Sequence, residues 1–311
     1  MSRRRPARQW SWSGLWLTLL AAALWGLAPV ATKATLTGFS PEFISCFRLA
    51  LSAALLRFLG GPGVRWVVAD RWLWLAGVAL GIDFIFYNYG LQRTAANVAG
   101  LVINIELVST IALAMWLLGE RLNAHRVLGS LVTLVGVLVV TCENVQLADL
   151  AVRARLIGNG LVMAAGVAWS LYAVAQHRAP YNYTLFQRLT PIFSVAALTT
   201  APMLLRPGAW TFAPTARATL MLAVLTVLCT ALVYFVYARA QQLIDVSVLA
   251  VLLTSIPLFA IAFAFVLLGE PLTRWLLAGA GLVIAGIVIM ATEKGTAAEP
   301  TAAFDAEPIQ P

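Results

Sequence analysis

The chain of 311 residues is too apolar for a water-soluble domain, with 61% hydrophobic and only 11% charged residues. A soluble domain carries roughly 25% charged residues. The net charge of +8 could serve an acidic partner, but the arginines gather at the ends of apolar segments, where they act as topology signals, so no nucleic-acid partner is expected. The composition therefore predicts a polytopic membrane protein surrounded by the lipid bilayer.

Several kinds of functional site are missing from the sequence. Three cysteines and two histidines are too few and too scattered for a disulfide framework or a metal site. No glycine-rich phosphate loop and no Gly-x-Ser-x-Gly nucleophile motif occurs. The sequence therefore predicts no catalytic residues, no metal and no cofactor, and a protein that is not an enzyme.

Apolar segments of about 20 residues recur along most of the chain, and each is long enough to cross the hydrocarbon core of a membrane. The first follows a basic start and resembles a signal peptide, but its length and the spans that follow favour a retained helix. Charged, proline and glycine breaks divide the chain into ten predicted spans, at 13–35, 41–59, 72–91, 95–118, 127–142, 156–177, 182–205, 217–238, 244–268 and 275–292.

A repeated decapeptide ends the fourth and the ninth predicted span. Residues 111–120 read IALAMWLLGE and residues 261–270 read IAFAFVLLGE, so seven of ten positions are identical after a spacing of 150 residues. A repeat of this kind indicates internal duplication and fixes the architecture first. At the same spacing, paired glycines predict close helix packing without chemistry, at Gly129, Gly136, Gly279 and Gly286.

Five spans in each half give the two halves opposite orientations, because an odd number of crossings brings the second half in from the other side. We therefore expect an all-α integral membrane fold of ten transmembrane helices, arranged as two inverted five-helix repeats. The expected divisions are a cytoplasmic basic segment at 1–12, a first repeat at 13–142, a connecting loop at 143–155, a second repeat at 156–292 and a disordered cytoplasmic tail at 293–311.

The positions of the basic residues favour a cytoplasmic location for both termini. With that orientation twelve basic residues lie inside and seven outside, as the positive-inside rule requires. The inside set is Arg3, Arg4, Arg5, Arg8, Arg57, Arg65, Arg71, Arg121, Arg126, Arg178, Arg239 and Lys294, and the outside set is Lys33, Arg93, Arg153, Arg155, Arg206, Arg217 and Arg274.

Three local features accompany the ten spans. The fourth predicted helix of each half ends in Leu-Leu-Gly-Glu, and the first carries a tryptophan, in Leu-Trp-Gly at 24–26 and Ala-Trp-Ser at 168–170. The second predicted helix of each half carries an arginine near its start, Arg48 in the first half and Arg188 in the second. Over residues 14–292 this pattern resembles the EamA branch of the drug/metabolite transporter superfamily. The resemblance implies transport of a small metabolite or drug, commonly export, across the bacterial inner membrane.

The repeated glutamates Glu120 and Glu270 are expected at helix ends on opposite sides of the membrane. There they would cap the start of the following helix or pair with a nearby arginine. Members of the family usually have a proline thirteen residues before this glutamate. Pro257 occupies that place in the second half and Leu107 in the first, so the implied helix break applies to the ninth span and is left open for the fourth.

Ionisable side chains inside apolar spans are costly, so each marks a candidate functional site. Four lie near mid-span, namely Arg48, Asp83, Glu106 and Arg188. The two acids are interpreted as proton-coupling groups, as counter-charges for a cationic or zwitterionic substrate, or as structural ion-pair partners of Arg48. The arginines could hold a substrate carboxylate, but their recurrence in both halves favours a structural role, such as satisfying helix-end carbonyls. Arg48 is the stronger functional candidate because acids lie in its half.

The acids do not recur in the second half. At the spacing of 150 residues, Val233 is the counterpart of Asp83 and Ile256 that of Glu106. The duplicated scaffold therefore did not impose them, and specificity is expected where the halves differ.

Aromatic and uncharged polar side chains complete the predicted site. Trp and Tyr also anchor helices at membrane interfaces, and buried amides usually bond across helices. Trp25 and Trp169 are favoured because both lie near mid-span at corresponding positions. The predicted substrate-binding set is Trp25, Arg48, Asp83, Tyr87, Asn104, Glu106, Trp169, Tyr172, Tyr234, Tyr237 and Thr254.

These features together predict a secondary transporter that exports a small metabolite, amino-acid-like or otherwise amphipathic, by alternating access. Its partners would be that small molecule and the bilayer, with proton coupling as one interpretation of the acids; no oligomeric state is predicted. A membrane enzyme acting on a lipid-linked substrate is the alternative, but it would need a second acid within a turn of Asp83 or Glu106, and neither has one. A scaffold or sensor without a central cavity is the third.

Overall fold

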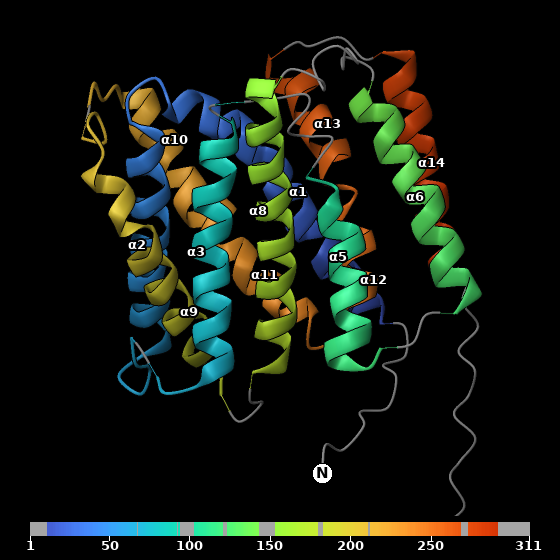
Figure 1. The fold of residues 1–311 in the computed structure, drawn as a ribbon, viewed down its shortest axis with the longest axis horizontal. Helices are drawn as coiled ribbons and strands as arrows, with labels where there is room; N and C mark the ends of the chain where they lie inside the picture. The colour runs from blue at the N-terminus through green and yellow to red at the C-terminus, as the bar shows by residue number, and fades with distance from the viewer. Residues whose placement is uncertain are drawn as a thin grey trace, which may run out of the picture.

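The computed structural model describes residues 11–66, 68–91, 93, 103–120, 123–142, 153–179, 183–210, 212–268 and 273–291. Their secondary structure is helical, apart from one isolated bridge between Phe39 and Phe212. The helices stand side by side as one bundle, with α6 and α14 at one edge of the view in Figure 1.

The first half supplies α1 (Trp12–Thr35), α2 (Pro41–Gly60), α3 (Arg71–Leu91), α5 (Ile105–Leu113), the π-helix η1 (Ala114–Leu118) and α6 (Ala124–Cys142). The second half supplies α8 (Arg153–Arg178), α9 (Leu185–Thr200), the 3₁₀-helix η2 (Ala201–Leu205), α10 (Ala216–Thr226), the π-helix η3 (Val227–Leu232), α11 (Val233–Ala240), α12 (Val246–Leu253), α13 (Ile256–Leu268) and α14 (Arg274–Ala291). Each of the ten predicted spans contains at least one of these helices.

The apolar helices fall into two classes of length. Six are long and apolar enough to cross a membrane, at Trp12–Thr32, Pro41–Gly60, Arg71–Gly90, Leu156–Arg178, Leu185–Leu205 and Ala216–Ala240. Four further apolar helices in the described part of the chain are shorter, at Ile105–Leu118, Ala124–Val139, Val246–Ala260 and Leu277–Met290. Several helices long enough to span make this a multi-pass membrane protein.

Short polar side chains begin several of the helices. The Ser40 hydroxyl accepts from the backbone N–H of Phe43 at the start of α2, and Pro41 occupies the first turn. Thr184 and Gln187 form a reciprocal capping box at the start of α9. Such caps satisfy N–H groups that the helix itself leaves unpaired, which matters most where no water is available.

A turn precedes α5 in the first half and α13 in the second, at nearly equivalent places. In the second half α12 ends at Leu253 and α13 begins at Ile256, just before Pro257. In the first half a turn over residues 103–104 precedes α5, although Leu107 stands where the proline would be. A turn thus precedes α5 without the proline, and because residues 94–102 lie outside the described part of the chain, the helix break itself is described only in the second half.

Contacts between the halves come in matched pairs. α1 packs on α10, α11, α12 and α13, and the equivalent first helix of the second half, α8, packs on α3 and α5. α2 packs on α9 and α6 on α14, so each of these helices contacts its own counterpart, and α5 packs on α12. Several contacts from one half to the other therefore have a partner with the roles of the halves exchanged.

The two first helices run in opposite directions. Gly14, in the first turns of α1, lies against Ile244, just before α12. Arg178, the last residue of α8, donates to the carbonyl of Leu117, 2.5 Å away, beside Glu120. Glu120 in turn contacts the first residues of α12. The start of α1 and the end of α8 therefore share one end of the bundle, which we call the Glu120 end.

Glycines set the distance between α6 and α14. A Cβ atom on Gly286 would lie 2.6 Å from the carbonyl oxygen of Gly129 and 2.1 Å from the Thr133 hydroxyl. A Cβ atom on Gly136 would lie 2.8 Å from the carbonyl oxygen of Gly279. The close packing predicted from the paired glycines is therefore confirmed. It follows from direct backbone contact between two helices.

Replacing Gly286 with alanine is expected to destabilise the protein by about 1–3 kcal/mol, because the new methyl group overlaps the backbone of α6. A Cβ atom added to Gly281, on the same helix, would have no neighbouring atom within 4 Å. The matched variant Gly281→Ala is therefore expected to leave the melting temperature unchanged or to raise it. Thermal unfolding in detergent measures both; equal melting temperatures for the two variants would contradict this account of the packing.

Candidate substrate-binding cavity

A cavity of about 440 Å³ lies among α1, α2, α3, α5 and α8. It reaches Leu36, which is 46% exposed, at the end of the bundle opposite the Glu120 end. Its lining is Thr32, Leu36, Pro41, Ile44, Ser45, Arg48, Asp83, Phe84, Tyr87, Asn88, Ile103, Glu106 and Trp169. Of the eleven residues predicted to bind substrate, five line it, namely Arg48, Asp83, Tyr87, Glu106 and Trp169.

Two carboxyl groups face this cavity without a protein partner. Asp83 comes from the middle of α3 and Glu106 from the first turn of α5. Neither side chain has a hydrogen bond or an ion pair with any described residue, and each acts electrostatically on the other. An unpaired carboxylate in apolar surroundings is costly, so the arrangement suits a cation or a proton.

Arg48 projects from α2 toward the second half of the chain. Its Nε donates to the Thr230 hydroxyl over 2.9 Å, and one of its terminal nitrogens donates to the carbonyl of Cys229 over 3.4 Å. The guanidinium carbon lies 5.3 Å from the centre of the Phe84 ring. Among the described residues Arg48 forms no ion pair with Asp83 or Glu106. Arg48 and Asp83 therefore interact electrostatically without direct contact, and η3 supplies the hydrogen-bond partners of Arg48.

Three uncharged polar residues of the lining were not in the predicted set. The Asn88 amide donates to the Ser45 hydroxyl over 2.7 Å and to the carbonyl of Phe84 over 2.8 Å, and Thr32 lies farther along α1. Helical spacing was the available signal. Ser45 lies about one turn before Arg48, and Asn88 one turn after Phe84.

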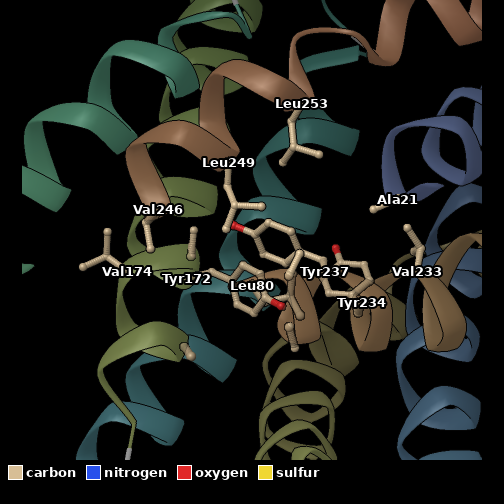
Figure 2. Packing of buried hydrophobic residues seen from close by; sticks show 14 of the residues in the cluster. Ala21, Leu80, Tyr172, Val174, Val233, Tyr234, Tyr237, Val246, Leu249 and Leu253 are labelled. Carbon is tan, nitrogen blue, oxygen red and sulfur yellow. The ribbon is translucent and has the colours of Figure 1, made fainter. Parts of the chain in front are cut away.

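Most of the predicted aromatic residues lie between the cavity and the Glu120 end. Tyr172, Tyr234 and Tyr237 are all buried and do not line it, and Trp25 packs among them. The Trp25 ring centre lies 5.3 Å from those of Trp169 and Tyr234 and 5.5 Å from that of Tyr237. Figure 2 shows the three tyrosines side by side, from α8 and α11, with Leu249 of α12 close to them. We call Trp25, Tyr172, Tyr234 and Tyr237 the aromatic cluster.

Two predicted residues lie at helix breaks and outside the lining. Asn104 immediately precedes α5, and Thr254 lies between α12 and α13, where its hydroxyl donates to the carbonyl of Val251 over 2.5 Å. Their equivalent places in the two halves indicate a local role in turning the chain.

Between the aromatic cluster and the Glu120 end, buried amides close the bundle. The Gln176 amide donates to the Gln241 side-chain oxygen over 2.9 Å, and the Gln241 amide donates to the Tyr237 hydroxyl over 3.0 Å. Arg188 donates to the backbone carbonyl of Gln176, near the end of α8. This contact agrees with the structural role expected for Arg188.

Glu120 joins the two halves at this end. Its carboxylate accepts from the backbone N–H groups of Val246, over 2.8 Å, and Ser247, over 3.0 Å. It thus caps a helix start, as expected, but the helix is α12 and not the α6 that follows it. The nearby ion pair between Arg126 and Asp245, 2.9 Å long, also joins α6 to the start of α12. Glu270 lies outside the described residues.

In the described ranges, no group of three or more His, Cys, Asp or Glu side chains is placed so that it could hold a metal ion. The described site is therefore a cavity with two acids, an arginine and an aromatic wall. That composition suits the reversible binding of a small organic molecule.

The model of the EamA-like transporter family matches residues 12–142 and again residues 156–292. The chain belongs to this family. It is a multi-pass membrane protein that transports small metabolites, and the two matched regions correspond to its two halves.

Several curated relatives are similar over most of their length. An uncharacterized transporter of Archaeoglobus fulgidus is 25% identical over 90% of this chain and 99% of its own. A protein of Streptantibioticus cattleyicolor, named a probable terminal-alkyne amino-acid exporter, is 27% identical over 89% of this chain and 92% of its own. A probable amino-acid metabolite efflux pump of Salmonella typhimurium is 27% identical over 88% and 93%.

A solved crystal structure shares the fold. It superposes with a TM-score of 0.78 at 22% identity, and the match covers 90% of this chain and 96% of that one.

Replacing Glu120 with alanine is expected to destabilise the protein by about 0.5–2 kcal/mol, the usual effect of losing a helix cap. Glu120→Gln retains one acceptor oxygen, so about half of that loss is expected. Thermal unfolding in detergent compares the variants. A melting temperature for Glu120→Ala equal to that of the wild type would show that water caps α12 equally well.

Proposed function

We propose that the protein is a secondary transporter that exports an amino-acid-like, amphipathic metabolite across the bacterial inner membrane by alternating access. The observation that carries this proposal is the cavity between the halves, with the carboxylates of Asp83 and Glu106 unpaired, Arg48 close by and aromatic rings around them. The names of the Streptantibioticus and Salmonella relatives support an amino-acid-like substrate.

Each part of such a substrate has a matching group in the cavity. An ammonium group offers three N–H donors to Asp83 and Glu106. A carboxylate accepts from Arg48, one of whose terminal nitrogens makes no hydrogen bond to the described residues. The apolar body lies against Phe84 and Trp169. When the substrate leaves, protons replace its ammonium group on the two acids, because neighbouring carboxylates in apolar surroundings repel each other. Export is thereby coupled to proton entry.

We further propose that the chain crosses the membrane ten times, as inverted repeats at 13–142 and 156–292 with both termini in the cytoplasm. The opposite directions of α1 and α8 support the inversion, and the matched contacts between the halves support two related repeats. Under this orientation the Glu120 end is cytoplasmic and the cavity reaches the outer end. The structure then corresponds to the outward-facing state of the cycle.

The alternative of a membrane enzyme is not favoured. Asp83 and Glu106 line one cavity, but the names of the relatives describe transport, and no third acid or metal ligand joins the two among the described residues. We infer that the protein is not an enzyme.

Replacing Glu106 with glutamine or Asp83 with asparagine is expected to weaken the binding of an amine-bearing substrate by about 10- to 100-fold, as for a lost hydrogen bond to a charged group. Each variant is also expected to flatten the pH dependence of transport. Efflux from proteoliposomes, screened with amino acids and their analogues, measures both effects.

Glu42→Gln is the matched control. Glu42 lies in the first turn of α2 and outside the cavity lining, and its carboxylate pairs with Arg206 over 2.9 Å. Its rate and pH profile are expected to equal those of the wild type. If Glu106→Gln and Asp83→Asn both kept the wild-type rate and pH profile for a confirmed substrate, the proposed coupling role would be wrong.

Replacing Arg48 with glutamine separates the two ends of the substrate. The affinity for a zwitterionic amino acid is expected to fall, whereas the affinity for its methyl ester, which has no carboxylate, is expected to stay near that of the wild type. Thr230→Val is the control, since it removes an acceptor of Arg48 and keeps the guanidinium. An equal loss for the acid and the ester would assign Arg48 to structure.

A further inference from the structure

The residues that line the cavity have counterparts in the other half of the chain. The spacing of 150 residues relates Phe84 to Tyr234 and Tyr87 to Tyr237. Trp169 corresponds to Trp25. Thr32 lies seven residues after Trp25 and Gln176 seven residues after Trp169, so Gln176 is the counterpart of Thr32. The counterparts are therefore Trp25, Gln176, Tyr234 and Tyr237.

These counterparts lie together, next to the cavity, where their rings pack against the lining residue Trp169. Trp25, Tyr234 and Tyr237 belong to the aromatic cluster, and Gln176 is linked to Tyr237 through the amide of Gln241. They fill the space between the cavity and the Glu120 end, where Gln176, Tyr234 and Tyr237 are at most 3% exposed. One set of equivalent positions thus surrounds a cavity while the other set is collapsed.

Two polar atoms have no hydrogen-bond partner in this region, one in the collapsed set and one on Tyr172, which packs against it. The Tyr172 hydroxyl and the Gln176 side-chain oxygen are both fully buried and unsatisfied among the described residues. A buried unsatisfied polar group costs about 1–3 kcal/mol, and in a native protein it calls for an explanation. A state in which water or a ligand reaches these atoms would satisfy both.

Polar contacts hold this region shut. Glu120 caps α12 and Arg126 pairs with Asp245, and both contacts join the first half to the second. Gln176 bonds to Gln241 within the second half. All are polar contacts near the Glu120 end, so water can replace each of them when the halves separate there. The apolar packing of the aromatic cluster against Val246 and Leu249 of α12 has to separate as well.

We propose that Trp25, Tyr172, Gln176, Tyr234 and Tyr237 form a second binding chamber, collapsed in this structure, that opens at the Glu120 end when the present cavity closes. The chamber takes the apolar body of the substrate against its rings and the polar groups of the substrate through the Tyr172 hydroxyl and the Gln176 amide. This inference rests on the proposed transport function, because an alternating cycle is what would open the chamber.

The chamber differs from the cavity in charge. Val233 and Ile256 stand at the positions equivalent to Asp83 and Glu106, so the chamber supplies no carboxylate for an ammonium group. The ammonium group therefore depends on the acids of the first half, while the chamber selects the size and shape of the apolar body.

Thiol labelling tests the chamber without knowledge of the substrate. In a chain whose Cys46, Cys142 and Cys229 are replaced by alanine, Thr32→Cys and Gln176→Cys are compared in inside-out and right-side-out vesicles with a membrane-impermeant maleimide. We expect Thr32→Cys to react only from the outer side and Gln176→Cys only from the cytoplasmic side. Val162→Cys, buried on the same helix as Gln176, is expected to stay unlabelled from both sides.

The Tyr172→Phe variant tests the chamber in a chain that keeps its packing. Because the hydroxyl has no partner in this structure, where the chamber is collapsed, its loss is expected to leave the melting temperature unchanged or to raise it. In transport, the KM for a confirmed substrate is expected to rise about two- to tenfold, as for one lost neutral hydrogen bond. A lower melting temperature with an unchanged KM would overturn the role of Tyr172 in the chamber.

The outcomes separate the chamber from the transport function. If proteoliposomes transport a metabolite while Gln176→Cys stays unlabelled from both sides, or reacts from the same side as Thr32→Cys, the chamber is wrong and the transport function stands. If no metabolite in the screen is moved while Gln176→Cys reacts from the cytoplasmic side alone, the chamber stands and the proposed substrate class fails.

Discussion

Polar groups inside a bilayer must find their partners within the protein, because hydrocarbon offers none. Most of the described polar groups obey this constraint, and the way they obey it determines the fold. Serine and threonine side chains return their hydroxyls to the preceding helical turn, as Thr18 and Ser130 do. Glu120 caps a helix of the other half, and Arg48 reaches the π-helix η3. Several contacts between the halves therefore satisfy buried polar groups, beside the close glycine packing of α6 on α14.

Four of the exceptions to this constraint lie at the cavity or in the aromatic region next to it. Asp83 and Glu106 face the cavity unpaired, and the Tyr172 hydroxyl and the Gln176 oxygen are buried and unpaired nearby. Single unsatisfied hydroxyls elsewhere belong to Thr133 of α6, Thr190 of α9 and Ser247 of α12. A purely structural bundle would have no reason to keep four such groups, since apolar residues of similar size would be more stable there. Their position along one path through the bundle, from one end to the other, is what a transport pathway requires.

Helix positions were predictable from the sequence, whereas contacts between helices were not. The spans were found because a membrane fixes how long an apolar segment must be, and paired glycines such as Gly129 and Gly286 marked a close approach. The partner of Glu120 could not be found in this way, since it depends on which helix of the other half lies nearby. Position along a span singled out Trp25 and Trp169, but position along a span does not distinguish the cavity wall, where Trp169 lies, from the packed cluster, where Trp25 lies.

The relation between the halves explains why the aromatic residues were misplaced and why the acids were not. Aromatic residues recur in both halves, so in any one state one set surrounds the cavity while its counterpart is packed away; sequence treats the two sets alike. The acids occur once, and their positions carry charge that the duplicated scaffold does not supply. A cycle between two such states is symmetric in shape and asymmetric in charge, because the carboxylates belong to one half alone. In the proposed cycle, the ammonium group of the substrate, or the protons that replace it, therefore stays with α3 and α5 while the two ends of the bundle open in turn.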